Sequence, residues 1–221
     1  MNSQIKLFPQ KNMNYTPQSR IKQFIWVTWL AKVLAEEIKC IYSIQQISNY
    51  QFPKQPNNYD STEHDEKVIQ RAITLEEQDF TVYVEQQNSF KVNGKIYDVC
   101  VSGRPDIVAV KDEWVIVEDI KTGKRKNSHK MQVLLYMLLL PLALETQDIC
   151  QKQIPHGRLI YPDGIVEIPA WQVDRKFRQR LREAIAIIAN SKSLNPKPSP
   201  WECRYCQIPH EYCQAKMAIR G

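Results

Sequence analysis

Two short apolar runs, separated by the three-residue polar turn 111–113, constrain this chain more than any other feature. Residues 105–110 and 114–121 are rich in Val and Ile, which favour β-strands, and the short turn makes the two strands antiparallel neighbours. An acid interrupts each run, with Asp106 near the start of the first strand and Asp119 near the end of the second. The hairpin therefore predicts that both carboxylates lie at one end of a sheet.

An amine belongs to the same pattern, because Lys121 follows Asp119 by two residues and side chains two apart on a strand share a face. Mg²⁺ and Mn²⁺ take oxygen ligands, so Asp106, Asp119 and the backbone carbonyl of Ile120 can form an open metal site. Such a metal lowers the pKa of a bound water and neutralises charge on a phosphate, while Lys121 positions the water or stabilises the transition state. The pattern points to phosphodiester hydrolysis, and the alternative is an acidic hairpin with a purely structural role.

The rest of the chain alternates helical and strand patterns, which predicts an α/β fold with a mixed central sheet flanked by helices. Strands are expected from residue 80 onward, with a hairpin turn at Asn93-Gly94 and another at residues 162–164. Helices are expected over residues 16–40, from Ser61 or Thr62 onward, over 128–145 and over 174–190.

The charge of the chain favours an anionic partner, since thirty Lys and Arg outnumber twenty-four Asp and Glu and give a net charge of +6. Two basic runs stand out, one over residues 121–130 and one over 175–182. Either run can also be an ordinary solvated face. The predicted phosphate contacts in the first run are Lys124, Arg125, Lys126 and Lys130.

The string Gly103-Arg104-Pro105-Asp106, followed by Asp119-Ile120-Lys121 and then by Gln132 and Tyr136, resembles the PD-(D/E)xK nucleases. More narrowly it is similar to the RecB-type branch, which includes the CRISPR-associated exonucleases with a C-terminal iron-sulfur cluster. The resemblance implies a restriction-endonuclease-like core in which Asp106, Asp119, Lys121, Gln132 and Tyr136 are catalytic residues.

The same resemblance implies that His64, on a helix before the strands, completes the Mg²⁺ or Mn²⁺ site. The alternative is a histidine satisfied within the core. Glu85, expected in an earlier strand, is a candidate for a further acid.

Three of the six cysteines form a local set, Cys203-x2-Cys206-x6-Cys213, which lacks a fourth ligand. The resemblance implies that Cys40, the cysteine that precedes the nuclease core, completes a 4Fe-4S cluster that ties together the two ends of the chain. A zinc site that uses His210 in place of Cys40 is the alternative. Cys100 and Cys150 are expected to be buried thiols.

These patterns divide the chain into a flexible tail over residues 1–15, a nuclease domain with an N-terminal helical segment over 16–190, and a cysteine-bearing tail over 191–221. The tail is expected to pack on the N-terminal helical region as a cluster subdomain. No secretory signal or membrane span is evident, so a cytoplasmic location is expected.

The expected activity is a metal-dependent exonuclease on single-stranded DNA, in repair, recombination or CRISPR-type defence, where protein partners of an adaptation or repair complex are possible. One alternative is an endonuclease of the restriction or junction-resolving kind. The other is an inactive nucleic-acid-binding module with zinc in its tail.

Overall fold

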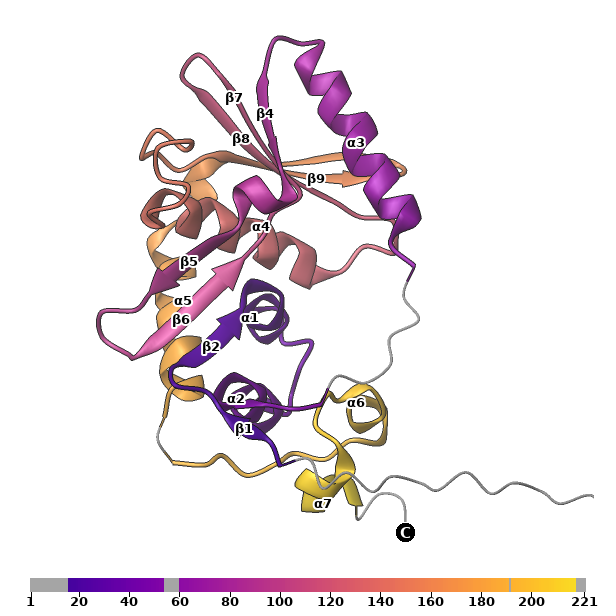
Figure 1. Ribbon diagram of the computed structural model, residues 1–221, viewed down its shortest axis with the longest axis vertical. Helices are drawn as coiled ribbons and strands as arrows, with labels where there is room; N and C mark the ends of the chain where they lie inside the picture. Colours follow the sequence, from indigo (N-terminus) through magenta and orange to yellow (C-terminus); the bar gives the residue numbers. More distant parts are fainter. Residues whose placement is uncertain (1–15, 54–59, 191, 218–221) are drawn as a thin grey trace, which may run out of the picture.

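The computed structural model describes residues 16–53, 60–190 and 192–217 of the chain (Figure 1). The predicted tail over residues 1–15 lies outside these residues. The described part contains no helix that combines the length and the apolar character needed to cross a membrane.

A five-stranded mixed sheet forms the centre of the fold. Its central strand β8 pairs antiparallel with β7 and parallel with β9, so the two apolar runs around the turn 111–113 are hydrogen-bonded neighbours as predicted. The hairpin predicted around residues 162–164 forms the edge of the sheet. In order across the sheet, the strands are β10 (Gly164–Ile168), β9 (His156–Tyr161), β8 (Trp114–Ile120), β7 (Ile107–Lys111) and β4 (Thr81–Val84).

Helices cover both faces of this sheet. Helix α3 (Thr62–Glu76) packs on β4, β7 and β8 through a small core that includes Val68 and Leu75. Helix α4 (Asn127–Leu139) covers the opposite face and contributes to a much larger core shared with α1 (Val27–Leu34) and α5 (Arg175–Ile188). The predicted α/β architecture, with a mixed sheet flanked by helices, is therefore present.

A second, three-stranded sheet lies next to the first, and its strand β6 (Val99–Gly103) leads into β7 through only three residues. In this sheet β6 pairs antiparallel with β5 (Phe90–Asn93) and parallel with β2 (Gln23–Trp26). The β5–β6 hairpin confirms the turn predicted at Asn93-Gly94, although the connection spans residues 94–98. A two-stranded pair joins β1 (Gln18–Ser19) and β3 (Tyr50–Gln51).

The single helix predicted over residues 16–40 is wrong. The chain forms β1 and β2 before α1 begins at Val27, and a further helix, α2 (Ile41–Asn49), follows Cys40. Phe24, Ile25 and Trp26 are aromatic or β-branched residues that suit a strand, and Ile25 is fully buried beside β6. Tertiary pairing therefore overrides a spacing that fits a helix.

The helices predicted over residues 128–145 and 174–190 are present as α4 and α5, but α4 ends several residues earlier than predicted. Helix α4 stops at Leu139 and a short 3-10 turn follows, because Pro141 removes a backbone donor. Helix α5 begins where Asp174 accepts a hydrogen bond from the backbone N–H of Phe177. The short helical elements are the 3-10 turns η1 (Glu85–Asn88), η2 (Leu140–Leu142), η3 (Ala170–Gln172) and η4 (His210–Tyr212) and the helices α6 (Pro200–Tyr205) and α7 (Gln214–Met217).

Candidate active site

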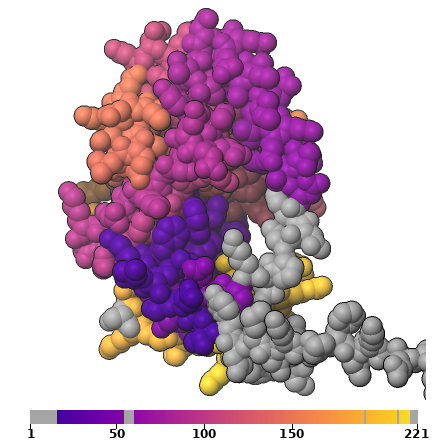
Figure 2. Space-filling model, viewed as in Figure 1, coloured from indigo at the N-terminus to yellow at the C-terminus, as the bar shows by residue number. Residues whose placement is uncertain are grey.

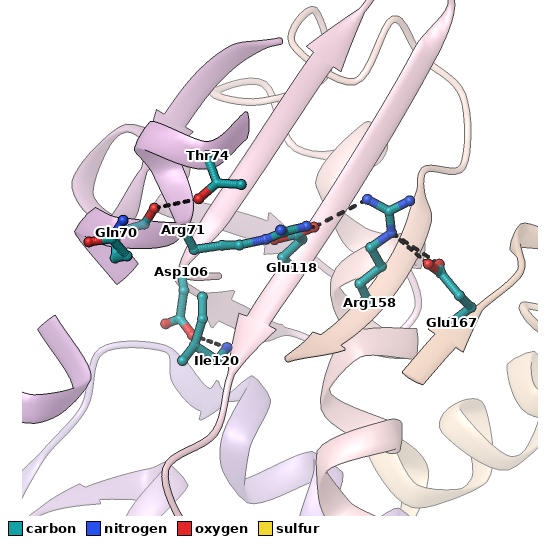
Figure 3. Close-up of polar contacts among 8 residues, drawn as sticks. All are labelled: Gln70, Arg71, Thr74, Asp106, Glu118, Ile120, Arg158 and Glu167. Atoms are coloured by element: carbon teal, nitrogen blue, oxygen red, sulfur yellow. Dashed lines mark hydrogen bonds and ion pairs between the residues drawn. The ribbon is translucent and has the colours of Figure 1, made fainter. Parts of the chain in front are cut away.

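The two acids predicted from the hairpin lie at the end of β7 and β8 where the sheets meet. Ile107 pairs with Glu118, so Asp106, one residue before β7, lies opposite the end of β8. Its Oδ2 accepts a hydrogen bond of 2.7 Å from the backbone N–H of Ile120 (Figure 3). The backbone next to Asp119 thus fixes the orientation of the Asp106 carboxylate.

Asp119 is buried, with only 1% of its surface exposed, and makes contacts of two kinds. Its Oδ1 accepts a hydrogen bond of 3.0 Å from Nε2 of Gln132. Its Oδ2 forms an ion pair with the Lys121 ammonium, but no partner in the described residues gives this oxygen a hydrogen bond of regular geometry. Burial raises the pKa of Asp119 to about 6, against the opposing effect of Lys121.

Lys121 lies on the same face as Asp119, as the strand period predicted. Burial lowers the pKa of the Lys121 amine, but the Asp119 carboxylate and its hydrogen bond outweigh that effect, and the net shift is upward. Lys121 therefore stays protonated and also donates a hydrogen bond of 3.3 Å to Oε1 of Gln132.

Gln132 and Tyr136 extend this group of polar contacts along α4. Nε2 of Gln132 donates to the Tyr136 hydroxyl over 3.0 Å, and that hydroxyl donates to the backbone carbonyl of Arg104 over 3.2 Å. The Tyr136 ring lies so close to β6 that a Cβ atom on Gly103 would be 2.7 Å from it. Glycine at position 103 thus lets Tyr136 reach the segment that carries Asp106.

His64 reaches the site from α3 on the other face of the sheet. Its Nε2 lies 3.4 Å from Oδ2 of Asp106, and its Nδ1 lies 3.5 Å from Oδ1 of Asp65. The hydrogen bond with Asp106 raises the pKa of His64 to about 9, in opposition to its partial burial. The structure therefore brings His64 to the predicted carboxylate rather than into the apolar core.

Glu85 does not lie in a strand, as the sequence suggested, but begins the 3-10 turn η1 after β4. Its backbone φ of 38° is in the left-handed region, and its N–H donates to the carbonyl oxygen of Asp106 over 3.0 Å. The contact that the structure gives Glu85 in the site is thus a backbone contact.

The four predicted phosphate contacts, Lys124, Arg125, Lys126 and Lys130, are exposed around the loop between β8 and α4. Arg125 is partly engaged, because its guanidinium lies 3.0 Å from Asp163 and 4.7 Å from the centre of the Tyr161 ring. In the second basic run, Arg180 turns inward and donates to the carbonyl of Leu34. The other four cations of the second run are exposed, so both runs offer accessible positive charge, and the first of them follows Lys121 directly along the chain.

The four cysteines of the predicted cluster line one cavity of about 340 Å³ between α6 and the start of α2. The backbone N–H of Lys197 donates to Sγ of Cys40 over 3.4 Å, and burial together with nearby Cys40 and Cys203 raises the pKa of Cys206. The side chain of His210, the alternative zinc ligand, lies outside the described residues. Cys100 and Cys150 are buried elsewhere, as predicted.

As placed in the described residues, no group of three His, Cys, Asp or Glu side chains is arranged to hold a metal ion. At the hairpin the carboxylate oxygens are turned to protein partners, the Ile120 N–H for Asp106 and the Lys121 amine and Gln132 amide for Asp119. The donor types nevertheless fit Mg²⁺ or Mn²⁺, since both side chains are carboxylates and the backbone of Ile120, which would supply a carbonyl oxygen, lies beside them.

Sequence reasoning missed a charged network on the opposite face of β8. Arg71 of α3, Glu118 of β8, Arg158 of β9 and Glu167 of β10 lie in a row across the strands (Figure 3). The signal was present, because a glutamate in the apolar strand next to Asp119 must point to the other face and needs a buried partner.

A family model described as the PD-(D/E)XK nuclease superfamily matches residues 29–214, a range that contains Asp106, Asp119 and Lys121. The chain belongs to this superfamily. Membership in the PD-(D/E)XK superfamily implies a nuclease that binds DNA, and its members typically use Mg²⁺ or Mn²⁺. A solved structure described as "Crystal structure of SSO0001" is similar at 22% sequence identity and a TM-score of 0.45, over 90% of this chain and 89% of that chain. A search of curated proteins found no significant match.

Proposed function

We propose that this PD-(D/E)XK protein is a Mg²⁺- or Mn²⁺-dependent deoxyribonuclease that degrades single-stranded DNA from an end. The observation that carries the hydrolytic part is the convergence of Asp106, Asp119 and Lys121, with the carboxylate of Asp119 buried against the Lys121 ammonium. Two carboxylates and an amine at one end of a strand pair form an arrangement that can hold a divalent cation and position a water.

Metal binding would use Asp106, Asp119 and the carbonyl oxygen of Ile120, with His64 as a further ligand beside Asp106. The bound ion would supply a water of lowered pKa and positive charge at the scissile phosphate. Both carboxylates would exchange a present partner for the ion, and His64 would bind through a neutral nitrogen.

Side chains of the site position the attacking water and the phosphate. Lys121, held protonated by Asp119, donates to the attacking water or to a phosphate oxygen as negative charge develops. Gln132 contacts both Asp119 and Lys121, and Tyr136 connects Gln132 to the backbone carbonyl of Arg104. These two residues therefore fix the positions of the Asp119 carboxylate and the Lys121 amine.

The preference for single strands and for ends rests on the resemblance to the RecB-type nucleases and on the four cysteines that share a cavity. We extend the proposal to a 4Fe-4S cluster held by Cys40, Cys203, Cys206 and Cys213. A role in repair, recombination or CRISPR-type defence belongs to the same proposal, and so do protein partners in such a complex.

The test is hydrolysis of linear and circular single-stranded DNA with Mg²⁺ or Mn²⁺ and with EDTA. We expect degradation of the linear strand with metal, none with EDTA, and a loss of at least about a hundredfold in Asp119→Asn and Lys121→Ala. Glu113→Gln, an exposed acid in the same hairpin, is the matched control and should retain activity. Full activity in both site variants would refute the assigned centre, and cleavage of the circle would indicate an endonuclease.

A further inference from the structure

Helix α6 presents two large aromatic side chains to solvent beside the cysteine cavity. Trp201 is 71% exposed and Tyr205 is 66% exposed. They lie four residues apart on one side of the helix, with ring centres 5.5 Å apart in an edge-to-face arrangement. The guanidinium of Arg204 lies 5.8 Å from the Tyr205 ring centre. We call Trp201, Arg204 and Tyr205 the α6 aromatic surface.

The opposite side of α6 is anchored, so the exposure of these rings is a fixed feature of the fold. The carboxylate of Glu202 accepts hydrogen bonds of 3.1 Å from the backbone N–H groups of Lys39 and Cys40. These bonds attach α6 to the start of α2 and leave Trp201 and Tyr205 on the outer side. In Figure 2 the yellow C-terminal segment reaches the surface to the right of the lower half.

The charge around the α6 aromatic surface is complementary to a polyanion. The cavity that Trp201 and Tyr205 line is also lined by the exposed lysines Lys32 and Lys126. Two acids also belong to the lining: the exposed Glu37, which accepts from the backbone N–H of Ser128, and the half-buried Glu202, which accepts from the start of α2. Three lysines, Lys32, Lys126 and Lys216, outnumber these acids, so the lining carries an excess of positive charge.

The loop that carries Lys126 connects this surface to the active site. Lys126 belongs to the loop that runs from Lys121 to α4, and α6 lies on the same side of the molecule as that loop (Figure 1). A strand cut beside Lys121 would extend along Lys126 to the two rings.

We propose that the α6 aromatic surface binds single-stranded DNA next to the active site, with bases stacked on Trp201 and Tyr205 and phosphates beside Arg204 and Lys126. This inference rests on the proposed nuclease function. Unpaired bases have free faces that stack on aromatic rings without regard to sequence, whereas the bases of a duplex are already stacked on one another. The combination of rings and cations therefore favours a single strand over a duplex.

The test is the affinity of the full chain for a fluorescent oligothymidylate of about twelve nucleotides, a length within the range that such sites cover. EDTA is present, so no cleavage occurs. We expect about a tenfold or greater loss of affinity in each of Trp201→Ala and Tyr205→Ala, and a larger loss in the double variant. Trp201→Phe and Tyr205→Phe should retain most of the affinity, because a ring remains.

Trp171→Ala is the matched control, since Trp171 is 76% exposed in η3, away from this surface. Metal content and thermal midpoint, measured on each variant, distinguish the removal of a stacking ring from damage to the folded tail. Wild-type affinity in the double variant would overturn the proposal and would favour a protein partner as the molecule that binds the α6 aromatic surface. An equal loss of affinity for a duplex of the same length would also overturn it. A wild-type protein that binds through these rings but cleaves no DNA with Mg²⁺ or Mn²⁺ would instead count against the nuclease function alone.

Discussion

Arg71 and Glu118 form an ion pair with two hydrogen bonds on the face of the sheet opposite Asp119. Nε and Nη2 of Arg71 each lie 2.7 Å from one carboxylate oxygen of Glu118, whose side chain is fully buried. Arg71 is two helical turns after His64 on α3, and Glu118 directly precedes Asp119 on β8. The pair therefore fixes the helix that carries His64 to the strand that carries Asp119.

We predict that Arg71→Leu lowers the free energy of unfolding by about 3–5 kcal/mol, because it leaves a buried carboxylate without its main partner. The second cation, Nη1 of Arg158 at 3.4 Å, offsets part of this cost. Replacing both Arg71 and Glu118 with Leu should cost much less than the sum of the two single changes. The measurement is urea unfolding of the four proteins.

The matched control is Lys67→Ala on the same helix, which removes an exposed ion pair with Glu63 and should cost less than about 1 kcal/mol. Equal stability of Arg71→Leu and the wild type would show that this pair does not hold α3 to the sheet.

The parts of the fold that the sequence predicts are those set by local pairing. The β7–β8 hairpin follows from its own alternation and short turn, which also place Asp119 and Lys121 on one face. Strand β2 cannot be predicted from local pairing, because its partner β6 lies about seventy residues later and the pairing is parallel. A parallel partner leaves no turn in the sequence, so Phe24, Ile25 and Trp26 read as part of a helix.

The candidate site divides in a similar way. Asp106, Asp119 and Lys121 are visible in the sequence because strand geometry alone brings them together. Gln132 is predicted only through the resemblance, since its contact with Asp119 depends on how α4 packs on the sheet. The ion pair of Arg71 with Glu118 is not predicted at all, because it depends on how α3 packs on the opposite face. Likewise the outward direction of Trp201 follows from the anchoring of Glu202 on α2, which no local pattern specifies.

The basic loop after β8 allows a prediction about salt. The affinity for single-stranded DNA falls as the salt concentration rises, and the slope of a log–log plot reports the number of neutralised phosphates. If Lys124 and Lys126 bind phosphates, replacing both with Gln should make this slope shallower by about 0.7 for each phosphate contact that is lost. Arg125→Gln should change the slope less, because its guanidinium already pairs with Asp163. Affinities measured in EDTA at several salt concentrations provide the slopes.

Lys95→Gln with Lys152→Gln is the control for that experiment, since both lysines are exposed on other loops. An unchanged slope in Lys124→Gln/Lys126→Gln would identify the run as ordinary solvated surface.

His129 allows a prediction about pH. Burial, together with Lys121 and Lys126, lowers the pKa of His129 to about 4 in the folded protein, below the 6.5 of a free histidine. Between these values the unfolded chain binds more protons, so the contribution of His129 to stability is complete above pH 6.5 and is lost as the pH falls toward 4. Its position in the first turn of α4, beside the positive end of the helix, acts in the same direction.

The measurement compares the free energies of unfolding of wild type and His129→Gln from about pH 7 to about pH 4, the range that brackets the two pKa values. Near neutral pH the wild type should be the more stable, because its ring bonds the Tyr161 hydroxyl at 2.9 Å. The difference should shrink as the pH falls, since glutamine does not titrate. A difference that stays constant over this range would show that His129 is not held neutral by its surroundings.

The last prediction concerns Cys40, Cys203, Cys206 and Cys213, which line one cavity between the two ends of the chain. If they hold a 4Fe-4S cluster, protein purified without oxygen should be brown and contain about four irons per chain. Cys40→Ser should bleach it and lower the thermal midpoint of the whole protein, because the cluster would join the tail to the start of α2.

The zinc alternative predicts a colourless protein with one zinc that survives Cys40→Ser and is lost in His210→Ala. Cys100→Ala and Cys150→Ala should retain the metal under either hypothesis, because both thiols are buried outside the cavity. They therefore separate the loss of a ligand from general damage to the core. A protein without iron or zinc after anaerobic purification would contradict both assignments and leave the four cysteines as thiols that pack α6 against α2.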